Sequence, residues 1–319
     1  MSLTALLQEE KNAKRKGGLY HKTQVNLAYN SNKIEGSKLT EEQTRCIFET
    51  RTIGFKEQEA VPVDDIIEAS NHFTAFDILL DTVYAPLSNT LIKEFHRILK
   101  ASTSDAAKDW FAVGDWKKRP NEVGGTQTTL PRHVETEMNQ LNEWYRSLPK
   151  IEFEAVIEHH WRFEKIHPFQ DGNGRLSRIL TTLLLLRAGY GYVPYSSMES
   201  VIEVNKDNYY LALRRTQQTI RKGKQNWEYW LVFFLRTMVK QKNNLAAKVK
   251  EQQALRSSLP ALSRQILELA KTRGEITVKE IEESTGANRN TIKVHLRRLA
   301  TDNYLAQVGK GRGARYTLK

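Results

Sequence analysis

The residues best suited to chemistry lie in one stretch of thirteen, Ile166 to Arg178, which reads IHPFQDGNGRLSR. His167 is the side chain here that can take up a proton near neutral pH. Asp171 can hold a divalent cation. Arg175 and Arg178 are three residues apart, so they can share one helix face and bind phosphate oxygens. Together these residue types predict phosphate chemistry.

Two predicted helices must position this stretch. Apolar residues at near-helical spacing predict a core helix over residues 152–166, and Pro168 should end it and push His167 into an extended conformation. A leucine-rich helix follows, and the loop between the helices leads into its N-terminus. Free N–H groups and the helix dipole favour an anion there, and Gly172 and Gly174 let the backbone approach a phosphate closely.

The stretch resembles the signature of the Fic family, His-x-Phe-x-Asp/Glu-Gly-Asn-Gly-Arg-x-x-Arg, at every fixed position. The resemblance implies a helical bundle that transfers AMP from ATP to a Ser, Thr or Tyr hydroxyl of a target protein or of the chain itself. It implies ATP as substrate and Mg²⁺ as cofactor. The related Doc kinases carry Lys where this chain has Gly174, so Gly174 favours nucleotidyl transfer over phosphorylation.

Carried over by position, the resemblance implies that His167 is the general base, Asp171 the magnesium ligand and Asn173 a donor to the α-phosphate. The two glycines of the motif resemble the anion-hole amides, and its two arginines resemble the clamps of the outer phosphates. The expected nucleotide-binding residues are Asp171, Gly172, Asn173, Gly174, Arg175, Leu176, Ser177, Arg178, Tyr209, Tyr210 and Gln217. The last three stand where the family places contacts to adenine, although an aromatic pair lies in a protein core at least as often.

Upstream, Ser31, Glu35 and Gly36 resemble the inhibitory motif of the family, Ser/Thr-x-x-x-Glu-Gly/Asn, on a helix predicted over about residues 24–36. The resemblance implies that Glu35 pairs with Arg178, which is then unavailable to the γ-phosphate. The alternative is an exposed glutamate near a helix end.

Residues 114–131 break the helical rhythm, because Pro120 and Gly124–Gly125 predict a turn or hairpin. In Fic proteins a β-hairpin flap here pairs with an extended segment of the target. The alternative is an ordinary surface loop. The expected docking residues are Asn121, Glu122, Val123, Gly124, Gly125 and Thr126.

The last sixty residues, 260–319, change character after a polar linker predicted over 248–259. Their order of helices, strand, glycine-rich turn and strand resembles a winged helix-turn-helix module. Residues 250–319 hold 14 Lys and Arg against 7 Asp and Glu, more than half of the net charge of +12. We expect DNA binding here, with a protein-contact module as the alternative. The expected DNA contacts are Arg289, Asn290, Lys293, Arg297, Lys310, Arg312 and Arg315.

The 319 residues are therefore expected to be mainly α, with a tail over 1–19 and a Fic domain over 20–247 ahead of the linker. A single cysteine, Cys46, excludes an intramolecular disulfide. No signal peptide and no apolar run near the ~20 residues of a membrane span are present, so we expect a soluble, cytoplasmic protein without membrane contact. A homodimer is compatible with the sequence.

The leading hypothesis is an autoinhibited protein adenylyltransferase. One alternative keeps the fold but transfers a different nucleotide, or removes AMP at the same site. Another is a DNA-binding regulator whose Fic domain senses nucleotide and catalyses little.

Overall fold

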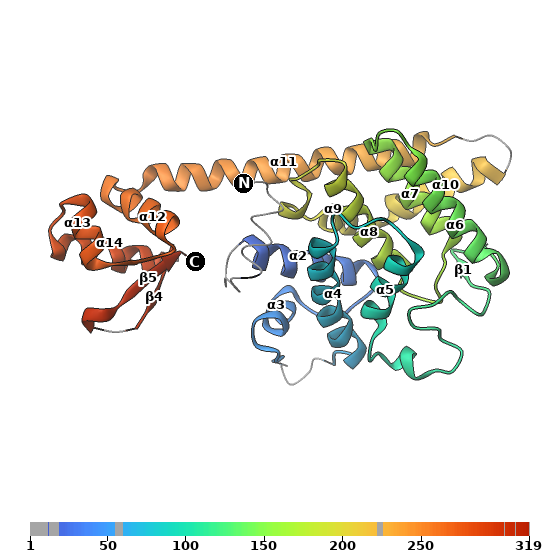
Figure 1. The fold of residues 1–319 in the computed structure, drawn as a ribbon, viewed down its shortest axis with the longest axis horizontal. Coiled ribbons are helices and arrows are strands. Elements are labelled where there is room, and N and C mark those ends of the chain that lie inside the picture. Colours follow the sequence, from blue (N-terminus) through green and yellow to red (C-terminus); the bar gives the residue numbers. More distant parts are fainter. Residues whose placement is uncertain are drawn as a thin grey trace. The chain divides into compact units, whose positions relative to one another are not determined.

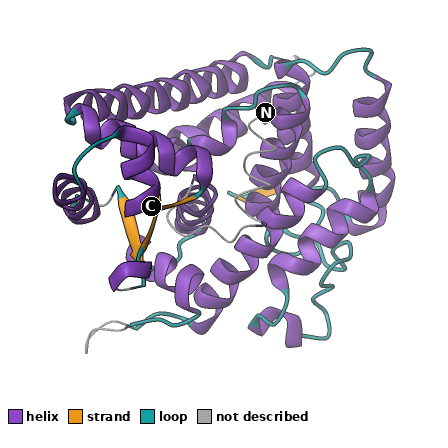
Figure 2. Ribbon diagram, turned by 60° about the vertical axis from the view of Figure 1, so that its left-hand side comes forward, coloured by secondary structure: helices purple, strands orange, loops and turns teal. Residues whose placement is uncertain are grey.

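The computed structural model describes residue 12 and residues 19–54, 60–221, 226–302, 304–309 and 311–318. Helices dominate these residues, with one two-stranded and one three-stranded sheet (Figure 2). The mainly α class predicted from the sequence is confirmed. The chain divides into two compact units, whose main parts are Leu19–Asn243 and Asn244–Lys319. Almost all of the predicted tail over 1–19 lies outside the described residues.

Ten helices are described between Leu19 and Ser258, and the last of them runs past Asn243, where the first unit ends (Figure 1). They are α2 Leu19–Ile34, α3 Glu41–Thr50, α4 Val63–Asp81, α5 Asn89–Lys100, α6 Pro131–Ser147, α7 Phe153–Ile166, α8 Asn173–Arg187, α9 Met198–Val204, α10 Lys206–Arg221 and α11 Glu228–Ser258, with 3-10 turns at Ser104–Ala107 and Val193–Tyr195. The last of these helices continues through nearly all of the segment 248–259 that was predicted as a linker.

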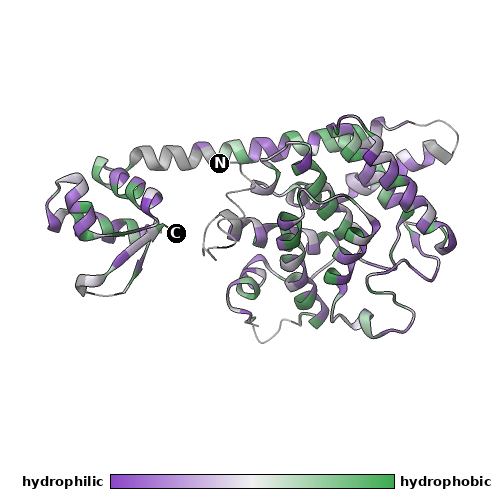
Figure 3. Ribbon diagram, viewed as in Figure 1, coloured by the Kyte–Doolittle hydropathy of each residue, from purple (hydrophilic) through white to green (hydrophobic). Residues whose placement is uncertain are grey.

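Helix α8 is the core of the first unit. Thirteen of its fifteen residues are buried, and Leu176, Leu183 and Leu184 are fully enclosed. Because α8 is buried around its whole circumference, other elements must cover it on every side, and α7 packs along it. The outer helices carry both hydrophobic and hydrophilic residues along their length (Figure 3). The N-terminus of α8 is therefore held in place by the core.

A smaller apolar cluster fixes α2 against α3 and α4. It comprises Ala28, Leu39, Ile47, Ala69 and Phe73. Thr40 begins α3 with a capping box, in which its side chain accepts from the backbone of Gln43 and the side chain of Gln43 accepts in return. Helix α2, which carries Ser31, is thus anchored along its length.

The predicted hairpin is present. Strands β1, Glu122–Val123, and β2, Thr126–Gln127, pair antiparallel, with Val123 opposite Thr126. Gly124 and Gly125 form the turn with φ of 56° and 73°, values that favour glycine.

The second unit contains helices α12 Ala261–Arg273, α13 Val278–Thr285 and α14 Arg289–Thr301, strands β3 Glu275–Thr277, β4 Leu305–Val308 and β5 Arg315–Leu318, and a 3-10 turn at Gly311–Gly313. The antiparallel sheet has the order β3-β5-β4. Strand β3 was not anticipated from the sequence. Apolar residues such as Ile281, Ile292 and Leu296 give this unit its own core. In the described residues no helix is both long and apolar enough to cross a bilayer.

Candidate active site

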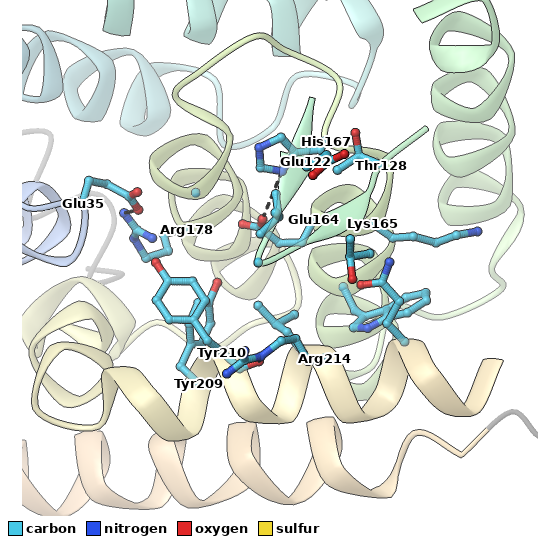
Figure 4. A pocket seen from close by; sticks show the side chains of 17 residues that line it. Glu35, Glu122, Thr128, Glu164, Lys165, His167, Arg178, Tyr209, Tyr210 and Arg214 are labelled. Atoms are coloured by element: carbon cyan, nitrogen blue, oxygen red, sulfur yellow. Dashed lines mark hydrogen bonds and ion pairs between the residues drawn. The ribbon is translucent and has the colours of Figure 1, made fainter. Parts of the chain in front are cut away.

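A cavity of about 520 Å³ opens between the hairpin and the helices α7, α8 and α10 (Figure 4). It is lined by Glu35, Glu122, Val123, Gly124, Thr126, Thr128, Trp161, Glu164, Lys165, His167, Gly174, Arg178, Tyr209, Tyr210, Leu213, Arg214 and Gln217. This volume lies in the usual range of ligand sites. Three residues of the sequence motif line it, namely His167, Gly174 and Arg178.

His167 caps the C-terminus of α7, and its N–H donates to the carbonyl of Phe163 at 2.8 Å. Its φ of 50° and ψ of 62° are left-handed, so the extended conformation expected from the following Pro168 is wrong. The left-handed cap satisfies the N–H and turns the chain sharply into the motif loop. Burial, and after it the charge of Lys117, lower the pKa of His167 to about 4. The imidazole is therefore neutral at pH 7 and can accept a proton.

Arg178 lies fully buried on α8 and is held by two residues of the predicted inhibitory motif. Its Nε donates to Ser31 Oγ at 3.1 Å, and its Nη2 donates to the Ser31 carbonyl at 3.0 Å and to Glu35 Oε1 at 2.8 Å. Although burial opposes the charge, Glu35 raises the pKa of Arg178 above its ordinary value. The ion pair predicted from the sequence is present. Nη1 of Arg178 is buried without a hydrogen bond among the described residues, so this guanidinium has an unused donor.

The turn that carries Glu35 follows directly on α2. The helix ends at Ile34, and the N–H of Gly36, whose φ is 98°, donates to the Lys33 carbonyl at 3.0 Å. Lys206, at the start of α10, donates to the Ile34 carbonyl. These contacts orient the Glu35 carboxylate, whose side chain is 31% exposed, towards Arg178.

Asp171 and Arg175 belong to a closed ring of alternating charges. Lys100 on α5 donates to Glu68 at 2.8 Å and to Asp171 Oδ2 at 2.7 Å. Arg175 in turn pairs with Glu68 on α4 and, at 3.3 Å, with Asp171 Oδ2. Burial opposes ionisation of Asp171, but Arg175 and Lys100 outweigh it and lower its pKa to about 2. Arg175 thus faces α4 and does not line the cavity, unlike the phosphate clamp expected from the sequence.

Asn173 makes a different contact from the one expected. Its Oδ1 accepts from the N–H of Phe169 at 2.9 Å, and its Nδ2 donates to the Phe169 carbonyl at 2.8 Å. The Phe169 ring is buried and stacks on the ring of His96, with 3.9 Å between the ring centroids. The buried amide of Asn173 therefore locks the loop. Gly172, with φ of 81°, begins α8 as its N-cap.

The remaining motif residues lie in the core. Leu176 is enclosed by apolar neighbours, and Ser177 contacts the carboxylate of Glu164. Tyr209 is also buried, and its hydroxyl bonds to His160 Nε2 at 2.9 Å, so it serves mainly to pack α10 against α7. Tyr210 is the more accessible of the two tyrosines.

Several cavity residues were missed by the sequence analysis. Tyr210 and Gln217, two of the expected nucleotide-binding residues, line the cavity from α10. Leu213 and Arg214 were missed; they lie three and four positions after Tyr210, so they share its helix face. Helical periodicity counted from Tyr210 would have found them. Trp161 lines the cavity from α7 and had been interpreted only as core.

Lys117 ties the hairpin to the motif loop. Its buried ammonium donates to Asn121 Oδ1 at 2.7 Å, to Thr128 Oγ1 at 2.6 Å and to the Ile166 carbonyl at 3.3 Å. Asn121 also donates to the Phe169 carbonyl at 2.9 Å. Burial lowers the pKa of Lys117 to about 8.

In the second unit the basic residues of α14, Arg289, Lys293 and Arg297, are exposed, as is Asn290. Arg289 lies 4.0 Å from Glu282, and Arg315 on β5 pairs with Glu275 at 2.9 Å. Lys310 and the side chain of Arg312 lie outside the described residues.

Comparisons with known proteins point to one family. Residues 86–185 match the Fic/DOC family. The chain is similar to the Protein adenylyltransferase Fic of Nematostella vectensis, with 33% identity over 174 residues, and to that of Drosophila willistoni, with 32% identity over 174 residues. Each match covers 51% of this chain but only 37% and 32% of the two relatives.

Solved structures give the same fold. The crystal structure of a Fic family protein from Desulfovibrio desulfuricans G20 has a TM-score of 0.59 at 19% identity and covers 100% of this chain and 96% of that chain. A Fic domain containing signaling protein from Bacteroides thetaiotaomicron has a TM-score of 0.58 at 22% identity, covering 76% of this chain and 96% of that one. At these identities the likeness shows the fold alone.

Proposed function

We propose, from the match of residues 86–185 to the Fic/DOC family, that the chain is a protein adenylyltransferase held inactive by Glu35. It transfers AMP from ATP to a Ser, Thr or Tyr hydroxyl of a target protein or of itself. The observation that carries the proposal is that His167, Gly174 and Arg178 line one cavity at the N-terminus of α8. These residues suit a polyphosphate, because His167 is a neutral base, Gly174 has no side chain to keep a phosphate away, and Arg178 has an unused hydrogen-bond donor.

The proposed reaction is an in-line displacement. The target hydroxyl gives its proton to the exposed nitrogen of His167, and its oxygen attacks the α-phosphorus of ATP. The bond from that phosphorus to pyrophosphate breaks, and the electron pair leaves with the pyrophosphate. The protein positions the groups, and the amides at the start of α8 with Arg178 stabilise the charge of the departing phosphates.

Asp171 fits the magnesium ion that the reaction calls for. The ion pairs of its carboxylate use Oδ2, and its side chain is about half exposed, so Oδ1 can face a cation. Among the described residues no three His, Cys, Asp or Glu side chains converge on one metal position. Mg²⁺ is commonly held by one carboxylate together with substrate phosphates, so a single ligand is sufficient. Bound there, the ion would neutralise phosphate charge.

Inhibition follows from the position of Glu35. Its carboxylate uses Nη2 of Arg178 and stands beside Gly174, where the outer phosphates would enter. Two negative groups cannot share that place without a large repulsion. We propose that ATP binds productively after Glu35 moves away.

We propose that the target protein docks at the hairpin. In the described part of the chain β1 and β2 pair with each other alone, so backbone groups at an outer edge can pair with an extended segment. Glu122, Val123, Gly124 and Thr126 border the cavity, which places such a segment near His167.

Labelling with nucleotides radioactive at the α-phosphate tests the proposal. Glu35→Gly should raise transfer of AMP, and adding His167→Ala should abolish it while ATP still binds. ATP, GTP and UTP are compared to distinguish a different nucleotide, and release of AMP from a labelled protein tests the reverse activity. Equal labelling with and without His167 would refute the assignment.

We further propose that the second unit is a winged helix that binds DNA; its order of helices and strands resembles that module, and one face of α14 is exposed and basic. Phosphate contacts weaken steeply with salt. A gel shift at two salt concentrations should show this loss, and Lys293→Ala with Arg297→Ala should weaken binding. Retained binding in that double variant would contradict the assignment.

A further inference from the structure

A second carboxylate lies behind the proposed base. Glu164 is on the last turn of α7, three residues before His167, and its side chain is 11% exposed. Its Oε2 lies 3.8 Å from His167 Nδ1 (Figure 4). Neither the sequence motif nor the family comparison assigns this residue a role.

Among the described residues, Glu164 is the one charged group that forms an ion pair with Nδ1 of His167. This nitrogen is buried and has no hydrogen bond of ordinary geometry there, although the backbone of Glu164 is close enough to raise the pKa of His167. On the other side of the carboxylate, the hydroxyl of Ser177 contacts Oε1, which fixes the orientation of the group. Glu164 is thus held between α7 and α8 with one oxygen directed at the imidazole.

We propose that Glu164 is a positioning residue for His167 in the adenylyl transfer proposed above, on which this inference rests. When the target hydroxyl transfers its proton to Nε2, the ring becomes an imidazolium in a buried place. The Glu164 carboxylate compensates that charge from the Nδ1 side and keeps Nε2 directed into the cavity. The proton of Nδ1 stays on the ring, and the proton taken up at Nε2 is released to solvent after pyrophosphate leaves.

The charges around Glu164 connect this role to inhibition. Burial raises the pKa of Glu164 to about 7, while the contact with Ser177 and the charge of Arg178 lower it and Glu35 raises it. Tyr209 on α10 also faces the carboxylate. When Glu35 withdraws, its repulsion ends and Arg178 favours the ionised form. Removal of Glu35 therefore also favours a negative charge on Glu164, beside Nδ1 of His167.

The test compares Glu164→Gln with its parent, both carrying Glu35→Gly. We expect kcat for AMP transfer to fall by about 10- to 100-fold, the range for a group that supports proton transfer, with KM for ATP changed less than about twofold. In the parent kcat should fall as the pH drops and Glu164 takes up a proton, and this acid limb should be absent from Glu164→Gln. Glu154→Gln, an exposed change on the same helix, is the matched control and should leave both quantities unchanged.

A kcat within about twofold of the parent, or a lower kcat that keeps the same acid limb, would overturn the positioning role. If the Glu35→Gly parent itself does not transfer AMP, the proposed function fails instead. In that case nitrogen NMR of His167 at pH 8 still tests the role of Glu164. The Glu164 carboxylate should hold the proton on Nδ1 of His167, so Glu164→Gln should increase the fraction of His167 that carries its proton on Nε2. An unchanged tautomer would exclude the role. Should Glu164→Gln not fold, Ser177→Ala, which frees Oε1, should lower kcat about threefold, and no loss would count against the proposal.

Discussion

The carboxylate of Glu35 lies so close to Gly174 that a Cβ at position 174 would come within 2.5 Å of Glu35 Oε1. The same Cβ would lie 3.2 Å from Nη1 of Arg178, the nitrogen with no partner among the described residues. The absence of a side chain at Gly174 therefore makes room for Glu35 in this structure, and for a phosphate in the proposed active one.

Gly174→Ala should weaken ATP binding even after Glu35 is removed, because the added methyl group occupies the space beside Arg178. In the Glu35→Gly background we expect affinity to fall by about tenfold or more, equivalent to about 1.4 kcal/mol, measured by calorimetry with Mg·ATP. Gly54→Ala is the control, since nothing lies within 4 Å of a Cβ there. Unchanged affinity in the Gly174 variant would show that phosphates bind elsewhere.

Glu68→Gln should destabilise the first unit, because both buried cations of the ring, Lys100 and Arg175, lose a carboxylate. Breaking a buried ion pair costs about 3 kcal/mol, so urea unfolding should show a loss of that order. Glu94→Gln removes the partner of the exposed Arg97 and should cost less than about 1 kcal/mol. Equal stability of the two variants would mean that the ring contributes nothing.

Stability should decline as the pH falls from about 6.5 towards 3, in part because of His159. Burial, and after it the charge of Arg162, lower the pKa of His159 to about 3 from its ordinary 6.5. In this pH range His159 takes up a proton in the unfolded chain but not in the folded chain, so acid favours unfolding. His159→Phe should reduce the slope by up to about 1.4 kcal/mol per pH unit. Urea unfolding at several pH values measures it, and an identical slope would contradict the prediction.

Lys117→Met should loosen the hairpin, because three oxygen acceptors lose their donor while the apolar stem is kept. We expect KM for the target protein to rise about tenfold, with ATP affinity changed less than about twofold. The loss of target affinity corresponds to about 1.4 kcal/mol. Steady-state labelling in the Glu35→Gly background measures it. Equal losses for ATP and target would instead indicate damage to the whole site.

The sequence predicted the parts of the site that depend on local rules. The hairpin turn and the start of α8 each depend on residues within a few positions of one another. Their geometry follows from backbone preferences that residue types reveal directly.

The charge ring around Asp171 could not be predicted in this way. It joins Lys100 to Asp171 across 71 positions and Glu68 to Arg175 across 107, so only the packing of α4, α5 and α8 brings the groups together. Arg175 fits the family signature, yet its partner Glu68 on α4 is a residue that the signature does not contain. The conformation of His167 was mispredicted because only the preference of residues before proline for extended backbone was considered. His167 also caps the C-terminus of α7, and that cap is left-handed.

The two members of the Arg178–Glu35 pair differ in their access to water, since the guanidinium is 1% exposed and the carboxylate 31%. A molecule in solution can therefore reach the Glu35 carboxylate, whereas the Arg178 guanidinium is buried. Under the proposed inhibition, moving the turn that carries Glu35 away from Arg178 would be enough to free the guanidinium.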